Sequence, residues 1–374
     1  MQRCGIITGG TWCVDRNRTV ESWPAEDKLA EILSEERRGG GSACNLAIDF
    51  KKLDPALPVE TIGIVGDDDD GRLLLAEADA HEIDRTQITI TDRAETQYTD
   101  AYTSQRSGRR THIYRRGAGA LLTPDHFDFQ KTNARMAHLG LPGVHTRMDA
   151  PWGADANGWV TVLKKAKAAG LMTNLELVSI SNEQIRALVR PCLPHLDLLI
   201  VNDHEIGALG MENTLGEGET NVAACTRAAH KTLADGAMRM VIVHFPTGAV
   251  AVLRERQVIC CSSFHLPPSQ IVGSNGAGDA FTAGFLLAFL ENWSIAASLR
   301  LGHAAAASLR SVSTTGAVEP WRTCLSGLGG SMGRTRTTPI LISVPRPAHW
   351  AGAPGSNRTP AAIGCLKRKS NPPP

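Results

Sequence analysis

The chain has 374 residues, of which 42% are hydrophobic and 21% charged, which is typical of a soluble globular protein of one large domain or two. The formal net charge is +1, but eight of the 39 basic residues and none of the 38 acidic ones lie in 320–374, so the first 319 residues carry a net charge of −7. An acidic body argues against a nucleic-acid-binding surface, and the longest apolar run, Ala280 to Leu290, is too short to span a bilayer.

Nine cysteines without CxxC spacing, and a start that lacks a long apolar stretch, indicate reduced thiols, no signal peptide and a cytoplasmic location. The histidines show no HxxH or HExxH spacing, so no zinc site is expected.

Short apolar runs that predict buried strands alternate with longer runs of helical periodicity. The alternation predicts an α/β fold with a mostly parallel central sheet and helices on both faces. The predicted strands are 4–9, 61–66, 136–141, 196–201 and 240–245, and the predicted helices are 42–53, 71–83, 157–170, 221–236 and 280–293.

Two stretches near the N-terminus carry polar groups placed for a ligand. Asp15 follows the first predicted strand, and the carboxyl ends of strands in open α/β sheets are where ligands bind. The stretch "GGGSACN" puts three glycines, which permit close backbone approach, before a helix whose first turn presents Asn45. The sequence equally allows Asp15 to be a turn residue and Asn45 to lie near a helix cap.

Acidic residues 67–70, in "GDDDDG", predict a turn and a helix start, where the helix dipole favours negative charge. A calcium loop is excluded because Gly66 stands at the position of its first acid.

Thr96 to Arg116 interrupts the alternation, since two β-type runs flank "RSGR" and predict a hairpin with Gly108 in its turn. Polar residues on both of its faces suggest that the hairpin leaves the main sheet, either as a lid over a ligand or as an edge hairpin.

Asn202 and Glu205, in "VNDHE", supply an amide and a carboxylate directly after a predicted strand. This pair suits a hydrated Mg²⁺ near phosphates, and it also suits a plain helix N-cap.

The stretch "GAGD" precedes a long apolar helix, and its glycines place unpaired N–H groups where an anion binds. As a dinucleotide fingerprint it is incomplete, because Phe281 stands where the third glycine belongs. The end of the chain is different: residues 329–374 are rich in Pro, Gly and Arg, which predicts a disordered tail.

Taken in this order, "GGGSACN", "GIVGDDDDG", "VNDHE" and "GSNGAGDAFTAG" resemble the ribokinase-like, or PfkB, carbohydrate kinase family over about Cys4 to Arg322. The resemblance implies a three-layer α/β kinase domain over 1–328, with a small β lid from segments 15–40 and 94–117. It implies phosphoryl transfer from ATP, with Mg²⁺, to a hydroxyl of a sugar or similar molecule, and a possible homodimer through the lid.

The resemblance also assigns roles to single residues. Asp279 matches the general base, and Gly276, Ala277 and Gly278 match the anion hole for the transferring phosphate. For the substrate hydroxyls, the matches are Asp15, Gly41 and Asn45. For Mg²⁺ and the phosphates, they are Asn202 and Glu205, with Glu205 acting on the metal through water. His303 matches the adenine pocket, and helix packing is its alternative role.

The chain departs from the family at two places. Gly273 stands where many relatives have an Asp that helps to build a monovalent-cation site, so K⁺ dependence is expected to be weak. His244 and Pro246 stand in a loop where the family tends to have Thr and Gly. Two other functions stay open: a ligand-binding protein that has lost turnover, and a nicotinamide-dependent oxidoreductase.

Overall fold

The computed structural model describes residues 3–216, 219–266, 276–308 and 318–327. The central sheet has two hydrogen-bonded parts, ordered β5-β4-β1-β8-β9 and β10-β13-β14-β15. Pairing is parallel throughout the first part and between β10 and β13, and antiparallel between β13, β14 and β15. The bounds are β1 Ile6–Gly10, β4 Val59–Gly66, β5 Asp84–Thr91, β8 Met136–Gly140, β9 Met172–Leu175, β10 Leu198–Asn202, β13 Met240–Phe245, β14 Gly248–Leu253 and β15 Val258–Ser262.

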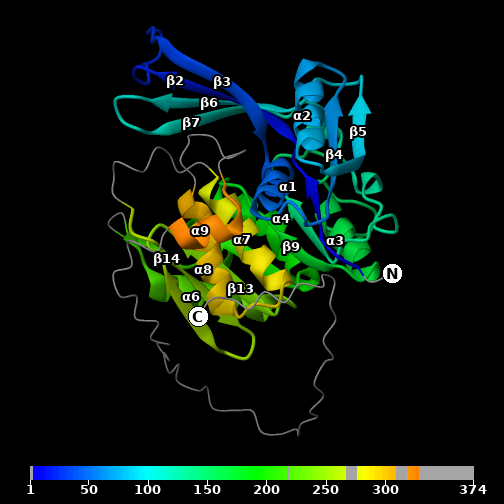
Figure 1. Cartoon of the computed structure of the whole chain (residues 1–374), viewed down its shortest axis with the longest axis vertical. Coiled ribbons are helices and arrows are strands. Elements are labelled where there is room, and N and C mark those ends of the chain that lie inside the picture. The colour runs from blue at the N-terminus through cyan, green and yellow to red at the C-terminus, as the bar shows by residue number, and fades with distance from the viewer. Residues whose placement is uncertain (1–2, 217–218, 267–275, 309–317, 328–374) are drawn as a thin grey trace, which may run out of the picture.

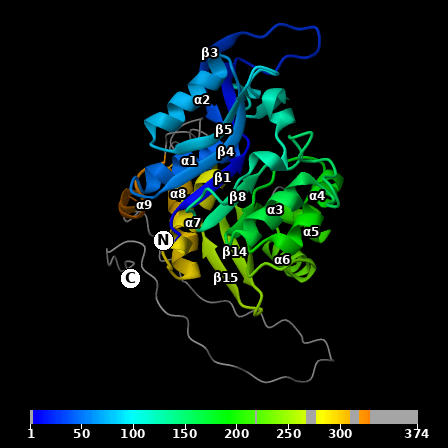
Figure 2. The same cartoon turned by 90° about the vertical axis from the view of Figure 1, so that its right-hand side faces the viewer.

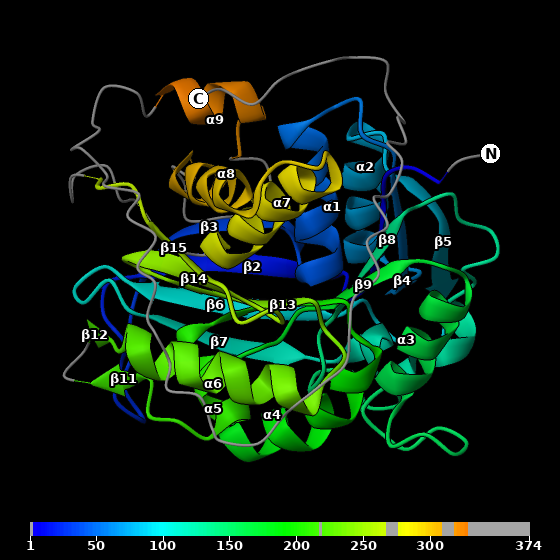
Figure 3. The same cartoon turned by 90° about the horizontal axis from the view of Figure 1, so that it is seen from below.

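Helices cover both faces of this sheet, as Figures 2 and 3 show. One face carries α1 (Ser42–Leu53), α2 (Asp69–Ala80), α7 (Ala277–Leu290), α8 (Ile295–Ser308) and α9 (Trp321–Gly327). The other carries α3 (Gly158–Ala168), α4 (Asn182–Val189), α5 (Asp203–Gly210) and α6 (Val222–Asp235). Each face buries its own apolar cluster, one around Phe50 and Phe285 and the other around Trp159. The predicted α/β fold is therefore confirmed.

Connecting elements are short. They are the 3₁₀ turns η1 (Gly117–Leu121), η2 (Pro124–His126) and η3 (Arg190–His195), and the two-residue strands β11 (Leu215–Gly216) and β12 (Glu219–Thr220).

A second sheet stands apart from the central one at one end of the molecule (Figure 1). Its order is β3-β2-β6-β7, from β2 (Cys13–Val20), β3 (Ile32–Gly40), β6 (Tyr98–Ser104) and β7 (Arg110–Arg115), and we call it the outer sheet. The β6–β7 hairpin turns at Gly108, whose φ of +65° favours glycine. The hairpin predicted at 96–116 therefore does leave the main sheet.

The acidic run before α2 begins that helix, as predicted. Asp68 is the N-cap and its Oδ1 accepts from the N–H of Gly71 at 2.7 Å. Asp69 and Asp70 lie in the first turn, where negative charge is favourable.

Among the described residues, no helix is long and apolar enough to cross a membrane. Gly273 and the tail at 329–374 lie outside the described residues.

Candidate active site

Polar groups converge where the strands of the central sheet end. The strand order reverses between β1 and β8, and such switch points are where open α/β sheets bind ligands. Glu176 directly follows β9, and Asn202 is the last residue of β10. The start of α7 faces the same rim, so residues from distant parts of the chain share one site.

The N-terminus of α7 supplies unpaired backbone donors. Gly276, at φ +69°, is the N-cap, and Ala277 is the first helical residue. The first N–H groups of a helix have no partner within the helix and carry its positive dipole end. Ala277 and Gly278 line a cavity of about 660 Å³, so these donors border a space large enough for a ligand.

Asp279 lies in the first turn of the same helix. Its Oδ2 accepts a hydrogen bond of 2.8 Å from Nδ2 of Asn45, which lies in α1. Burial, followed by the neighbouring Glu176, raises the pKa of the Asp279 carboxyl well above its usual value. Because a raised pKa makes a carboxylate more basic, this position suits proton transfer.

Asp15 lies within strand β2 of the outer sheet, inside the segment 15–40 that the resemblance gave to the lid. The alternative of a turn residue is wrong because β2 begins at Cys13, with only two residues between it and the end of β1. Burial, and then the charge of Asp279, raise the pKa of Asp15 to about 7. The two carboxyl groups therefore border the same space.

The three glycines of residues 39–41 make room for protein groups. A Cβ on Gly40 would lie 2.4 Å from the Asp15 carboxyl, and one on Gly39 would lie 2.2 Å from Glu77. Gly41, at φ +86°, is the N-cap of α1, and a Cβ there would lie 2.6 Å from a Thr11 methyl carbon. The glycines thus let Asp15 lie against the start of the helix that carries Asn45.

Aromatic side chains line the 660 Å³ cavity. The ring of Phe281 packs between the rings of His244 and His303, with centroids 5.1 and 5.0 Å away. Burial lowers the pKa of His303 to about 4, so its ring is neutral. Its Nε2 is buried without a partner among the described residues, which leaves one polar atom for a ligand. Pro246 also lines the cavity.

Asn202 and Glu205 form a capping box at the start of α5. Asn202 Oδ1 accepts from the Glu205 N–H at 2.8 Å, and Glu205 Oε2 accepts from the Asn202 N–H at 3.0 Å. The cap interpretation of this pair is therefore correct. Burial raises the pKa of Glu205 to about 7, which reflects a carboxylate with too little compensating positive charge.

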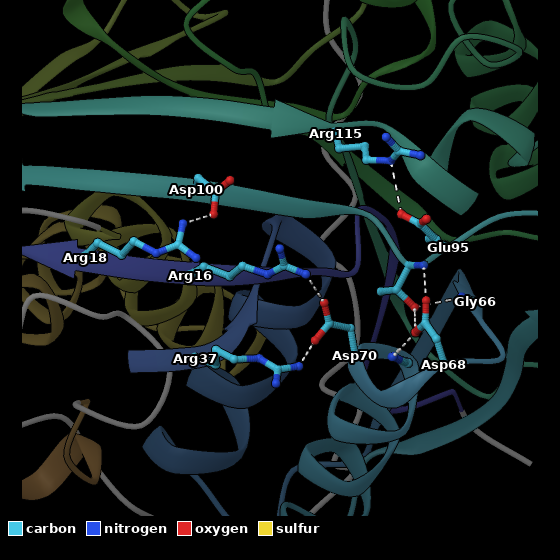
Figure 4. Close-up of polar contacts among 11 residues, drawn as sticks. Arg16, Arg18, Arg37, Gly66, Asp68, Asp70, Glu95, Asp100 and Arg115 are labelled. Carbon is cyan, nitrogen blue, oxygen red and sulfur yellow. Dashed lines mark hydrogen bonds and ion pairs between the residues drawn. The ribbon is translucent and has the colours of Figure 1, made fainter. Parts of the chain in front are cut away.

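Two acids of the "GDDDDG" run join the outer sheet to the body (Figure 4). Asp70 accepts from Arg16 Nη2 of β2 at 2.8 Å and also pairs with Arg37 of β3. Asp68 accepts from Thr96 through both the backbone N–H and the hydroxyl, at 2.7 and 2.6 Å. The start of α2 therefore anchors the strand pair β2–β3 and the segment that leads into β6.

The sequence profile of "pfkB family carbohydrate kinase" matches residues 6–323. The chain belongs to the pfkB family of carbohydrate kinases. The resemblance read from the motifs, over about Cys4 to Arg322, is thus confirmed.

Relatives of this pfkB protein are sugar and nucleoside kinases. It is 26% identical over 309 residues to an ATP-dependent ribose-1-phosphate kinase of Halopiger xanaduensis, covering 81% of this chain and 90% of that one. It is 26% identical over 308 residues to a 5-dehydro-2-deoxygluconokinase of Shouchella clausii, covering 80% and 88%. In structure it is similar to an Arabidopsis thaliana ribokinase complexed with ribose and ATP, with a TM-score of 0.67, 22% identity, and coverage of 88% and 99%.

Sequence reasoning missed several polar residues close to Asp279. Glu176 escaped attention because the strand β9, four residues long, was not predicted, so its carboxyl end could not be inspected. His138 lies in the predicted strand 136–141, but nothing in the sequence distinguished it from a buried core residue. The signal available was Glu176 itself, a lone acid within an apolar run. Asp49 lies in α1 one turn after Asn45, fully buried, with neither carboxyl oxygen hydrogen bonded to a described residue.

Proposed function

We propose that this protein transfers the γ-phosphoryl group of ATP to a hydroxyl of a sugar or sugar-like molecule. The observation that carries the proposal is the start of α7, where one helical turn holds both a carboxylate and unpaired backbone donors. Asp279 lies on the side of Asn45 and Asp15, while Ala277 and Gly278 border the 660 Å³ cavity. A proton acceptor and an anion site therefore lie side by side in one helical turn, with the anion site at the cavity.

The reaction follows from this arrangement. The substrate oxygen forms a bond to the γ-phosphorus as the bond to the bridging oxygen of ADP breaks, and the hydroxyl proton passes to Asp279. The N–H groups of Gly276, Ala277 and Gly278 hold the negative oxygens of the transferring group. Positioning and charge stabilisation of this kind account for most of the catalysis in phosphoryl transfer.

The sugar lies between the outer sheet and α1 in this proposal. Asp15 and Asn45 take substrate hydroxyls, while Gly41 allows the backbone to come close. The outer sheet acts as the lid, and the bonds of Asp70 and Asp68 that anchor it support that role. Polar lid side chains on the face of Asp15, such as Arg110 and His112, suit a substrate rich in hydroxyls.

ATP occupies the aromatic cavity in this proposal, with its triphosphate toward α7. The ring of His303 hydrogen bonds to the backbone of Cys261. Because Nε2 is the ring atom without a partner, Nδ1 is the donor and Nε2 is a free acceptor. An exocyclic amine of a purine is a matching donor, which supports His303 as an adenine contact.

Mg²⁺ fits near Glu205. The ion is usually held by one or two carboxylates together with phosphates and waters, and Glu205 is a buried carboxylate without a cationic partner among the described contacts. Bound there through water, the ion would offset phosphate charge, while Asn202 keeps the carboxylate in place.

The protein is proposed to be a homodimer through the outer sheet. Exposed apolar side chains on or beside this sheet support the idea: Trp23, Leu29, Ile32, Leu33 and Ile113. Light scattering of the wild type and of Ile113→Asp tests it, since a dimer should become a monomer only in the variant.

Asp279→Asn tests the kinase assignment. We expect kcat to fall by at least about 10²-fold, because the base is lost while the shape remains. ATP affinity should be kept or slightly tightened, because a negative charge near the phosphates is gone. ADP release should be measured with ribose, fructose, adenosine and ribose 1-phosphate as acceptors.

The matched control is Asp125→Asn, an exposed acid in the 3₁₀ turn η2. Normal turnover in Asp279→Asn would show that Asp279 only caps the helix, a role that contributes about 1 kcal/mol to the free energy of unfolding. Ligand binding without ADP release by the wild type, for every acceptor, would favour a non-catalytic binding protein.

A further inference from the structure

A line of polar side chains lies behind Asp279, on the carboxyl ends of β8 and β9. Asn174 Nδ2 hydrogen bonds to His138 Nδ1 at 3.0 Å, and His138 Nε2 lies 2.7 Å from Glu176 Oε2. The Glu176 carboxyl in turn hydrogen bonds to the Asp279 carboxyl. Asn174 and His138 are fully buried, so water does not substitute for these contacts.

The direction of each hydrogen bond follows from the donors. Asn174 Nδ2 can only donate, so His138 Nδ1 accepts and the ring proton is on Nε2. Burial lowers the pKa of His138 to about 3, so the ring carries only this one proton. His138 therefore donates to Glu176, which fixes the orientation of the carboxyl group.

The contact between Glu176 and Asp279 needs a proton of its own. Two ionised carboxylates only accept hydrogen bonds, so one of the pair must be protonated for the bond to exist. Burial is the main cause of the raised pKa of each group, which for Glu176 is about 7, while the hydrogen bond between them raises the pKa of Asp279 and lowers that of Glu176. Like charges at this distance also oppose double ionisation, and such a pair titrates as a unit.

We infer that Glu176 is a positioning residue for the proposed base: it shares one proton with Asp279, and His138 and Asn174 hold it in place. This inference rests on the proposed function of Asp279. The hydrogen bond between the pair favours the proton on Asp279, and transfer of this proton to Glu176 leaves Asp279 ionised toward the substrate hydroxyl. Taking the hydroxyl proton converts the pair from one proton and one negative charge to two protons and no charge. The extra proton leaves to water after product release.

Other acids near the pair favour keeping the proton. They belong to separate elements that face the pair, and all carry or would carry negative charge: Asp49 on α1, Asp15 on β2 and Glu205 on α5. The amide of Asn45 is the uncharged donor on the substrate side. A second ionisation would add another negative charge to this acidic site and repel the phosphates of ATP.

Glu176→Gln is the first test, because a carboxamide still donates to Asp279 but neither gains nor loses a proton. With the acceptor that gives the highest rate, the measurement is the pH dependence of kcat in the wild type and in the variant. Above pH 7 the wild-type kcat should decline as the pair loses its shared proton, whereas the variant should not decline. Glu183→Gln, an exposed glutamate in the first turn of α4, is the matched control and should follow the wild type.

Glu176→Ala removes the support altogether. We expect kcat to fall by about 10²-fold with little change in KM, the loss typical of a slightly misplaced group. Wild-type kcat in Glu176→Ala, or identical pH profiles for Glu176→Gln and wild type, would overturn the inference.

Unfolding provides a readout that needs no substrate. Because the folded state still holds the shared proton at a pH where the unfolded carboxyls, with a pKa of about 4, have lost theirs, wild-type stability should fall as pH rises from about 4 through 7 and then level off. Glu176→Gln and Asp279→Asn should each reduce this fall by a similar amount, and the double variant should add little. Additive effects would mean that the two groups titrate separately and would refute the shared proton. Normal activity of Asp279→Asn, by contrast, would refute only the proposed function of the base.

Discussion

Nδ2 of Asn45 donates a 2.8 Å hydrogen bond to Oδ2 of Asp279, although the two residues are 234 positions apart. The bond joins the first turn of α1 to the first turn of α7, so two helix starts meet at one carboxylate. Asn45 Oδ1 is buried without a partner among the described residues, which leaves an acceptor for a substrate hydroxyl.

Asn45→Ala should therefore affect both orientation and binding. The variant removes one donor to the Asp279 carboxylate and one acceptor for the substrate, and each charged hydrogen bond contributes about 1.5–3 kcal/mol. We expect kcat/KM for the sugar to fall by at least about tenfold, with KM for ATP unchanged. Steady-state kinetics with each substrate varied in turn measures this, and an equal loss for ATP would contradict the assigned position.

Asp15→Ala should raise KM for the sugar more than it lowers kcat. The carboxyl group borders the substrate space from the outer sheet and has no described bond to a phosphate-side residue. Its loss should raise KM by one or two orders of magnitude, on the scale of about 1.5–3 kcal/mol per charged bond. An unchanged KM for the substrate with the highest rate would reduce Asp15 to a structural role.

Asp70→Asn should loosen the outer sheet. The Asp70 side chain is only 9% exposed and pairs with both Arg16 and Arg37, so the substitution leaves two guanidinium groups without their anion. We expect faster amide hydrogen exchange in β2 and β3, and a several-fold higher KM for the sugar with nearly unchanged kcat.

Asp69→Asn is the matched control for Asp70→Asn. Asp69 lies on the same helical turn, but its side chain is 89% exposed and, among the residues that the structure describes, pairs with Arg72 alone. Equal exchange rates in the two variants would show that Asp70 does not anchor the sheet.

Asp49 should make stability depend on pH. Burial raises the pKa of its carboxyl well above the usual value, so the folded state binds a proton that the unfolded state releases. The stabilisation is present below the unfolded pKa of about 3.9 and is lost as pH rises through the higher folded pKa. Urea unfolding of wild type and Asp49→Asn at pH 5, 6.5 and 8 should give curves that diverge toward pH 8, with the variant the more stable. Parallel curves would contradict the prediction.

Potassium should have little effect on the rate. Gly273 offers no carboxylate where many relatives have one, so we expect less than about a tenfold difference when K⁺ replaces a bulky organic cation, which corresponds to 1.4 kcal/mol. Initial rates in matched chloride salts measure it, and a strong requirement would mean that other groups build the site.

The sequence by itself determined the local features of this protein. The predicted helix 42–53 coincides with α1, Asp68 caps α2 as its acidic run suggested, and the glycine-rich "GAGD" begins α7. Periodicity, capping and glycine conformations act within a single segment. Their structural preferences can therefore be judged from that segment alone, without knowing which elements pack against it. The order of the four motifs was enough to indicate the family.

Only the tertiary structure decided which groups meet. Asp15 lies in a strand, and not in a turn, because the outer sheet pairs its segment with β3 and β6. The contacts of Glu176 with His138 and Asp279 depend on β8 and β9 being neighbours, and the pairing of Asp70 with two arginines depends on where the outer sheet rests. Sheet order and burial set these distances and pKa values. Neither the sheet order nor the burial of a side chain can be deduced from the residues next to it in the sequence.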